Sequence, residues 1–435
     1  MNTTTIPFAG AASYPVRSGN LVKPLIDGEP AFRRICMAIE AAQHTIYATV
    51  TFLWANFVMP DHRGSMWEVL DKAVARGLDV RFIFWRPDEE TAWLRQNAFW
   101  GSADHIDFLN KRNSGIKIRW DRAHSGFCQH QKSWLIDAGH DNETAFVGGI
   151  NLNPHSMVSP GHYGEGHNHD VYVELTGPSV VDVHHNFVQR WNEASERSVE
   201  DGRWGIGSEV NLEFPVEIPT ARGQASVQIQ RTIHVGRYFD GKATPGGKSF
   251  AIAAGEQSNF MQYCIAINAA CRTIYIENQQ IDVPEIITPL KNALERGVYV
   301  VLLMPLSAQV PSALAAYENF SVAGIAGLDA AGYRKPVYIH AKLMLIDDEW
   351  ATVGSCNLHR FSLFGNSEMN AAFSDIDTVR TFRSTLFQEH LGQDTYNLDD
   401  REAIRLFRRI ATENRKKYES GDHNWRGLVC ERLSN

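Results

Sequence analysis

The sequence HQKSWLID at residues 130–137 recurs as HAKLMLID at residues 340–347. Each stretch carries an apolar run that is typical of a buried strand. In a strand, side chains at positions i and i+2 project from the same face, so each histidine points the same way as the lysine two positions later. Asp137 and Asp347 follow their histidines at an odd offset and therefore face away from them. We interpret both aspartates as structural residues that anchor a turn or pair with a buried partner.

Further blocks recur in the same order around these two stretches. They are AIEAAQHTIYATVTF (38–52) with AINAACRTIYIENQQI (266–281), LDKAVARGLDVRFIFW (70–85) with LKNALERGVYVVLLMP (290–305), and AFVGGINL (145–152) with ATVGSCNL (351–358). In both copies a helix ends near a glycine and leads into an apolar strand. Because the paired blocks recur in the same order, they indicate a duplicated unit. We predict an α/β fold of two α-β-α sandwich halves, residues 1–205 and 206–435, related by a pseudo-twofold axis. The Gly- and Pro-rich stretch 196–223 contains the predicted join.

Composition and charge narrow the class of protein. The chain has 435 residues, 44% of them hydrophobic and 21% charged, which excludes disordered and collagen-like classes. Its 42 basic and 50 acidic residues give a formal charge of −8, which disfavours a nucleic-acid partner. No apolar run approaches the roughly 20 residues that cross a bilayer. The six cysteines are scattered without a CxxC pair, so we expect reduced thiols and neither a redox centre nor a structural zinc site.

The first residues bear on localisation. The sequence MNTTTIPFAGAASYPVRSGN lacks the basic start and apolar centre of a secretory signal. We expect a protein that is cytoplasmic at synthesis, and export without a cleaved signal peptide stays open.

Each histidine–lysine strand is followed by a turn that ends in an asparagine. Gly148-Gly149 and Gly354-Ser355 let the backbone approach a ligand, and Asn151 and Asn357 can donate amide hydrogens to an oxyanion. Brought together by the pseudo-twofold, these residues suit a phosphodiester. Lysine charge neutralises its oxygens, one neutral imidazole attacks phosphorus, and the other, protonated, donates to the leaving oxygen. We expect catalysis through a covalent phosphohistidine, without metal or cofactor, by His130, His340, Lys132 and Lys342.

The sequence resembles the phospholipase D superfamily, whose signature is HxKxxxxD followed by a G-[GS]-x-N turn. The signature is matched in the first half by His130, Lys132, Asp137 and Asn151, and in the second by His340, Lys342, Asp347 and Asn357. The resemblance implies two halves packed face to face around one active site, with His130 as the nucleophile and His340 as the acid and base. It also implies that Asp170 and Glu368 accept hydrogen bonds from the two imidazoles. Which carboxylate serves which histidine stays open.

Within the superfamily, segments 169–192 and 275–281 look most like phospholipase D proper. The resemblance then implies hydrolysis of the headgroup phosphodiester of a glycerophospholipid to phosphatidic acid, at a membrane or micelle surface, with transphosphatidylation when an alcohol competes. The alternative is a phosphatidyl-transferring synthase that makes phosphatidylserine or cardiolipin, and a phosphodiesterase nuclease is disfavoured by the charge. Because the chain carries both motifs, we expect a monomer without a transmembrane segment. Headgroup preference stays open, because Gln280 and Ile281 stand where this family often has an aromatic pair.

Other segments invite a membrane or metal interpretation. Residues 52–60 and 310–333 are apolar and suit either a lid or buried core. Residues 401–421 form an amphipathic basic helix that could meet anionic headgroups, although we favour packing through its apolar side chains. A glycine-rich stretch carries four histidines, which are His155, His162, His167 and His169. Their spacing matches no zinc or iron template, so we interpret the stretch as a loop at the mouth of the pocket.

Overall fold

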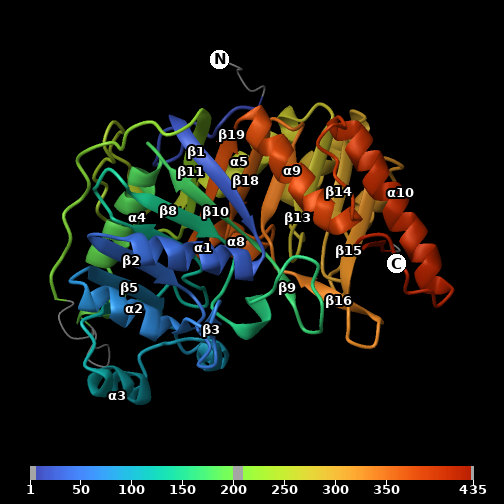
Figure 1. Ribbon diagram of the computed structural model, residues 1–435. Helices are drawn as coiled ribbons and strands as arrows, with labels where there is room; N and C mark the ends of the chain where they lie inside the picture. Colours follow the sequence, from blue (N-terminus) through green and yellow to red (C-terminus); the bar gives the residue numbers. More distant parts are fainter. Residues whose placement is uncertain (1–5, 199–208, 433–435) are drawn as a thin grey trace.

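The structure is a computed structural model that describes residues 6–198 and 209–432 (Figure 1). The predicted boundary between residues 205 and 206 lies outside the described residues. On either side of it, each half contains a mixed β-sheet with helices packed on both faces. The α/β fold predicted from the sequence is therefore confirmed.

The first sheet contains three parallel strands and four antiparallel ones. Parallel pairing joins β2 (Thr45–Val50), β5 (Asp79–Trp85) and β6 (Lys117–Asp121). On the other side of β2 the order continues with antiparallel β7 (Ser133–Ile136), β8 (Thr144–Gly148), β10 (Val171–Thr176) and β1 (Arg17–Ile26).

The second sheet repeats this order strand for strand. Its parallel strands are β13 (Thr273–Glu277), β14 (Tyr299–Leu303) and β15 (Phe320–Leu328). Its antiparallel continuation is β17 (Leu343–Ile346), β18 (Trp350–Gly354), β19 (Glu368–Ser374) and β11 (Ala225–Ile233). The matching order shows that the paired sequence blocks are one structural unit repeated.

Strand pairing also joins the two halves. β1 pairs with β11, so the two sheets are continuous. On the other edge of the second sheet, β16 (Arg334–Ile339) and β20 (Val429–Glu431) pair with β15, and β16 also pairs with β9 (Asn168–His169) of the first half. The remaining short strands are β3 (Val58–Met59), β4 (Gly64–Ser65) and β12 (Glu256–Gln257). Because backbone hydrogen bonds between the halves join β1 to β11, β9 to β16 and His130 to Ser367, the two halves pack as one unit.

The helices cover the sheets in layers. One face of the first sheet packs on α1 (Gly28–Ala41) and α2 (Met66–Ala75), and the other on α4 (Val180–Asn192). The second sheet packs on α5 (Ser258–Ala269) and α6 (Pro284–Glu295) on one face, and on α9 (Ile376–Leu391) and α10 (Asp400–Glu419) on the other. Shorter helices complete the fold: α3 (Ala103–Arg112), α7 (Ser312–Ala315) and α8 (Arg360–Phe364).

Local sequence explains where several of these helices begin and end. Ser65 and Glu68 form a reciprocal capping box at the start of α2, and Asp399 and Glu402 do the same for α10. Gly77, after α2, has φ +89°, which a residue with a Cβ rarely adopts. The predicted glycine cap is therefore confirmed there.

Two segments flagged in the sequence take part in the core. α10 buries Ile404, Phe407 and Ile410, as the preferred interpretation predicted. Residues 320–328 form strand β15, so this part of the stretch 310–333 is core and not a lid. Among the described residues, no helix combines the length and apolar character needed to span a bilayer.

Candidate active site

The two histidine–lysine motifs meet across the junction of the halves. His130 lies just before β7 and His340 just before β17, and each side chain is about nine-tenths buried. The amide of His130 donates to the carbonyl of Ser367 at 2.8 Å, and the amide of His340 donates to the carbonyl of His169 at 2.8 Å. Each motif therefore starts on backbone supplied by the opposite half.

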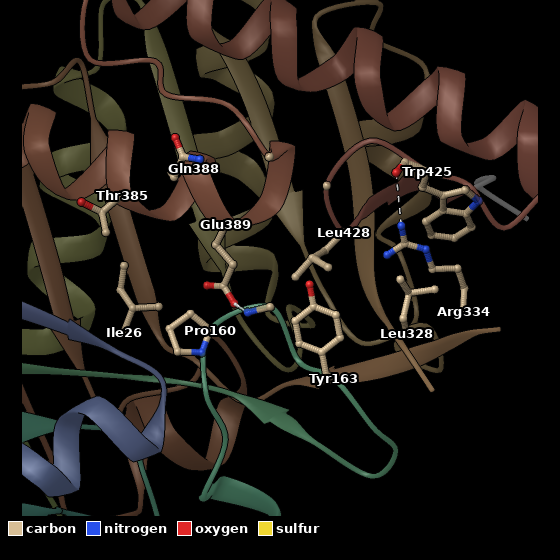
Figure 2. A pocket seen from close by; sticks show the side chains of 13 residues that line it. Ile26, Pro160, Tyr163, Leu328, Arg334, Thr385, Gln388, Glu389, Trp425 and Leu428 are labelled. Carbon is tan, nitrogen blue, oxygen red and sulfur yellow. Dashed lines mark hydrogen bonds between the residues drawn. The ribbon is translucent and has the colours of Figure 1, made fainter. Parts of the chain in front are cut away.

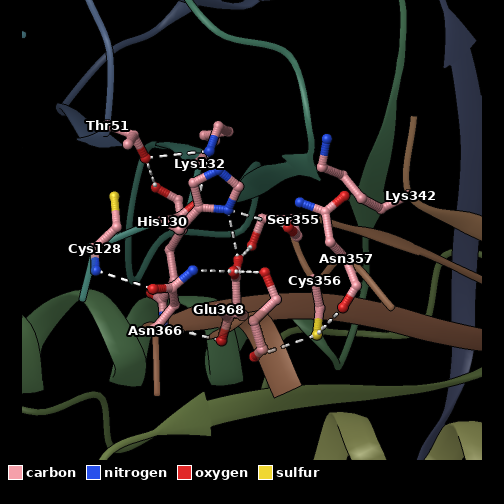
Figure 3. A network of polar contacts seen from close by, with 12 residues as sticks. Thr51, Cys128, His130, Lys132, Lys342, Ser355, Cys356, Asn357, Asn366 and Glu368 are labelled. Atoms are coloured by element: carbon pink, nitrogen blue, oxygen red, sulfur yellow. Dashed lines mark hydrogen bonds and ion pairs between the residues drawn. The ribbon is translucent and has the colours of Figure 1, made fainter. Parts of the chain in front are cut away.

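The carboxylates that hold the two imidazoles are also exchanged between the halves. His130 Nδ1 lies 2.9 Å from Glu368 Oε2, a contact marked by a dashed line in Figure 3. His340 Nδ1 lies 2.5 Å from Asp170 Oδ2. A carboxylate accepts the Nδ1 proton, which leaves Nε2 of each neutral ring with its lone pair. The sequence left open which carboxylate serves which histidine. In the structure each histidine is paired with the carboxylate of the opposite half, His130 with Glu368 and His340 with Asp170.

The Glu368 carboxylate is itself held by neutral donors. Ser355 Oγ and Ser362 Oγ each donate to it at 2.6 Å, and Asn366 Nδ2 donates at 3.2 Å. Burial alone would raise the pKa of Glu368, but His130 and these donors lower it, so the group stays ionised. Burial lowers the pKa of His130 to about 4. The ring is therefore neutral near pH 7.

The two lysines are buried beside their own histidines. Lys132 Nζ donates to the carbonyl of His130 at 2.7 Å and to Thr51 Oγ1 at 3.2 Å. Lys342 Nζ donates to the carbonyl of His340 and, at 2.6 Å, to Gln279 Oε1. Burial lowers the pKa of Lys132 to about 8 and that of Lys342 to about 7.

Thr51 and Gln279 are positioning residues that the motif analysis missed. Thr51 lies six residues after Thr45, the first residue of β2, and Gln279 lies six residues after Thr273, the first residue of β13. β2 and β13 are the equivalent strands of the two halves. The two residues therefore occupy equivalent places in the duplication. An alignment of the two repeat blocks, 38–52 and 266–281, continued to their last residues, could have identified Thr51 and Gln279.

The asparagines of the two glycine turns are buried at the same junction. Asn151 Nδ2 lies 3.5 Å from His340 Nε2. Asn357 lies beside Lys342 in Figure 3. The side-chain oxygens of both asparagines make no hydrogen bond within the described residues. These amides are therefore placed to serve a ligand that sits between the two imidazoles.

Asp137 and Asp347 lie apart from this cluster. The Asp347 carboxylate accepts backbone amide protons from Cys271, Arg272 and Thr273 at 2.7–2.8 Å. Asp137 accepts the amide protons of residues 43–45 in the same way. Each aspartate anchors the turn that leads into the first parallel strand of its half.

Asp347→Ala is expected to lower the free energy of unfolding by about 2–4 kcal/mol, because three backbone amides lose a charged acceptor. Urea denaturation followed by circular dichroism measures the change. Asp141→Ala is the control, since Asp141 is exposed. An unchanged midpoint for Asp347→Ala would show that this turn does not depend on its carboxylate.

The glycine-rich histidine loop is not a simple pocket rim. His155 is exposed, as a loop residue would be, but His162 and His169 are fully buried. His169 Nδ1 lies 2.9 Å from Asp27 Oδ1, and its Nε2 lies 2.9 Å from Glu277 Oε2. The sequence interpretation is wrong for these two histidines, because it could not see the carboxylates that distant segments place around them.

Comparison with known proteins supports one family. A family model described as "Cardiolipin synthase, PLD-like domain" matches residues 35–191 and 263–390. Phospholipase D alpha 2 of Oryza sativa subsp. japonica is 23% identical, over 93% of this chain and 67% of the relative. The probable cardiolipin synthase YwiE of Bacillus subtilis (strain 168) is 24% identical, over 94% and 72%.

A solved structure has the same fold. The phosphatidylserine synthase of Haemophilus influenzae Rd KW20 aligns with a TM-score of 0.52 at 14% identity, over 92% of this chain and 94% of that one. The family match covers both copies of the motif, and the site has two such motifs facing each other. The chain therefore belongs to the phospholipase D superfamily and is an enzyme of the phosphodiesterase type.

Proposed function

We propose that this protein is a phospholipase D, which hydrolyses the headgroup phosphodiester of a glycerophospholipid to phosphatidic acid. One observation carries the proposal. Two imidazoles are each held at Nδ1 by a carboxylate of the opposite half, so neither Nε2 is bound to a carboxylate, and two buried lysines lie beside the rings. Such a pair suits a displacement in which one ring attacks phosphorus and the other manages the proton.

In the first step His130 Nε2 attacks phosphorus. The P–N bond forms, the bond from phosphorus to the headgroup oxygen breaks, and that oxygen takes the Nε2 proton of His340. In the second step water attacks phosphorus and gives its proton back to His340 Nε2, and the P–N bond breaks to release phosphatidic acid. His340 must carry an extra proton at the start. The negative phosphodiester favours that proton by raising the pKa of the ring above its value of about 4 in the empty site.

The positive charge of the two lysines stabilises the negative charge that develops on the phosphoryl oxygens. Lys132 and Lys342 lie beside the histidines of their own motifs, and the side chains of Asn151 and Asn357 add neutral donors. Preorganised donors in a buried site contribute more to a transition state than the same groups in water.

A cavity formed by residues that follow Thr51 on the chain favours a lipid over a nucleic acid. It has a volume of about 550 Å³ and begins at Leu53 and Trp54, directly beyond Thr51 on the chain. Its wall includes the aromatic side chains of Phe57, Trp67, Phe99, Trp100 and Phe108, and also two arginines, Arg95 and Arg112. Apolar surface of this kind fits an acyl chain, whereas a nucleic acid prefers a basic groove.

Phosphatidyl transfer is the second candidate. The relatives include cardiolipin synthases as close as the plant enzymes, such as cardiolipin synthase A of Pseudomonas entomophila (strain L48), which is 25% identical over 83% of this chain. The same phosphohistidine would serve both reactions, because the second step accepts either water or an alcohol. The two functions differ only in the acceptor that reaches phosphorus.

A headgroup panel tests the proposal. The full chain is incubated with phosphatidylcholine, phosphatidylethanolamine, phosphatidylglycerol or cardiolipin in mixed micelles, with and without ethanol, and the products are identified by mass spectrometry. Phosphatidic acid in the absence of alcohol supports hydrolysis, and phosphatidylethanol when ethanol is added supports the shared intermediate. Cardiolipin formed from phosphatidylglycerol, with no phosphatidic acid, would assign the transferase instead. No product from any phospholipid, together with degradation of plasmid DNA, would overturn the lipid proposal.

The dependence of activity on pH should follow the loss of charge on Lys132 and Lys342. A lysine whose pKa is lowered loses its charge as the pH rises through that value, here about 7 for Lys342 and about 8 for Lys132. We expect kcat/KM to fall as the pH rises through about 7 and then about 8. A bound phosphodiester anion raises both pKa values, so kcat should persist to higher pH than kcat/KM. Micellar assays from pH 5 to pH 10 measure both constants, and a kcat/KM that stays flat to pH 10 would contradict a binding role for these amines.

A further inference from the structure

A second cluster of titratable side chains lies outside the proposed active site. It joins both halves: Asp27 follows β1, His162 and His169 precede β10, Glu277 ends β13, and Glu389 lies in the last turn of α9. The side chains of the first four are fully buried, and that of Glu389 is 5% exposed. A group of imidazoles and carboxylates this deep needs a compensating positive charge.

Four of these residues, Asp27, His162, His169 and Glu389, place one possible ligand atom each within 4.8 Å of the others. His162 Nε2 lies 3.3 Å from Asp27 Oδ2 and 3.2 Å from Glu389 Oε1. His169 Nδ1 lies 2.9 Å from Asp27 Oδ1 and 3.9 Å from Glu389 Oε2. Ligands bound tetrahedrally to zinc at about 2.0–2.2 Å are about 3.3–3.6 Å apart, so these separations bracket the spacing that one small ion would impose.

Three of the atoms in this group lack hydrogen bonds. Asp27 Oδ2, Glu389 Oε2 and His162 Nε2 are buried and make no hydrogen bond within residues 6–198 and 209–432. Buried polar atoms without a hydrogen bond are uncommon and mark a place where an ion or water belongs. Here they belong to three separate segments and share one space.

The surroundings of His169 match those of a metal-bound histidine. Its Nε2 lies 2.9 Å from Glu277 Oε2, and Glu277 Oε1 accepts from Tyr275 at 2.7 Å and from His390 Nε2 at 3.0 Å. Metal-ligating histidines usually donate their second N–H to a carboxylate in this way, which fixes the tautomer. With the proton on Nε2, the Nδ1 lone pair faces Asp27 and Glu389.

An opening leads to the cluster. Glu389 lines a cavity of about 550 Å³, together with Pro160, Gly161 and Tyr163 (Figure 2). The carboxylate of Glu389 accepts the amide proton of Gly161 at 3.0 Å, which orients it. An ion can therefore reach the cluster from solvent without passing through the proposed active site.

We propose that Asp27, His162, His169 and Glu389 bind one divalent transition-metal ion. Zinc fits best, since it favours four ligands drawn from imidazole and carboxylate. Four protein ligands close the site, so its role is structural. The carbonyl of His169 accepts the amide protons of His340 and Ala341 at 2.8 and 3.0 Å, and the next residue, Asp170, holds the His340 ring. The ion thereby positions the second histidine–lysine motif.

Metal content of the full chain is the direct test. The chain is purified without chelators, its metals are measured by inductively coupled plasma mass spectrometry, and the stripped protein is titrated with zinc against a chromogenic chelator. We expect about one zinc per chain, a lower melting temperature after chelation and recovery on zinc addition. Less than about a tenth of an ion per chain, with no shift in melting temperature on adding zinc or manganese, would overturn the proposal. The cluster would then be held by imidazolium charge, since Asp27 and Glu389 raise the pKa of His162 to about 9 against the effect of burial.

Variants separate the ligands from their neighbours. Asp27→Asn and His162→Gln should lose zinc, whereas His155→Gln and His167→Gln, in the same loop but outside the cluster, should keep it. If a ligand variant fails to fold, the zinc titration of the unaltered chain still decides the question. His130→Ala should bind zinc like the unaltered chain while losing phospholipid turnover, so a failure of the proposed function and a failure of the metal site give different results.

Discussion

His130→Ala is expected to lower kcat on phospholipid by at least about 10³-fold, because the atom proposed to bond to phosphorus is removed. The fold should survive, since the ring is replaced by a smaller side chain at the edge of β7 and the backbone bond to Ser367 remains. Release of headgroup from mixed micelles measures the loss. His140→Ala is the matched control, because His140 is exposed. Activity within about tenfold of the unaltered chain would remove His130 from the chemistry.

A covalent trap distinguishes the two histidines. His340→Asn removes the proposed acid and base but leaves His130 able to attack a substrate with a good leaving group. Quenching by denaturation at alkaline pH, where the P–N bond is stable, followed by peptide mass spectrometry should then find a phosphatidyl adduct on the peptide that contains His130. An adduct on His340 in the His130→Asn chain, with none on His130 in the other variant, would reverse the assigned roles.

Glu368→Gln and Asp170→Asn are each expected to lower kcat by about 10²- to 10⁴-fold. Each amide removes the charge that orients an imidazole and stabilises its protonated form. The comparable change of the triad aspartate to asparagine in a serine protease costs about 10⁴-fold. Because the pairs are crossed, Glu368 acts through His130 and Asp170 acts through His340. The two variants should therefore fail at different steps.

An activated substrate separates these steps. A p-nitrophenyl phosphodiester has a leaving group that needs no proton, so the defect of Asp170→Asn in forming the intermediate should shrink, while that of Glu368→Gln should persist. Burst kinetics of nitrophenolate release report this first step directly. Asp141→Asn, at an exposed position, controls for the loss of one charge. Equal defects with both substrates in both variants would contradict the division of roles.

The sequence alone determined the repeat and the faces of its strands. The paired blocks predicted the duplicated α/β unit, and the seven strands from β1 to β10 recur in the same order from β11 to β19. The interpretation of Asp137 and Asp347 as turn anchors is confirmed, but each histidine and lysine lies just before β7 or β17 and not within a strand as the sequence predicted. These features depend on neighbours within one strand or turn, which local periodicity records.

Only the tertiary structure decided which groups face each other across the halves. Glu368 and His130 are 238 residues apart, and Asp170 and His340 are 170 apart. Their pairing follows from the way β1 joins β11 and β9 joins β16, a choice that no local pattern encodes. The same holds for His162 and His169. Their spacing fits no metal template, because two of the four proposed ligands, Asp27 and Glu389, come from segments that only the folded chain brings to them.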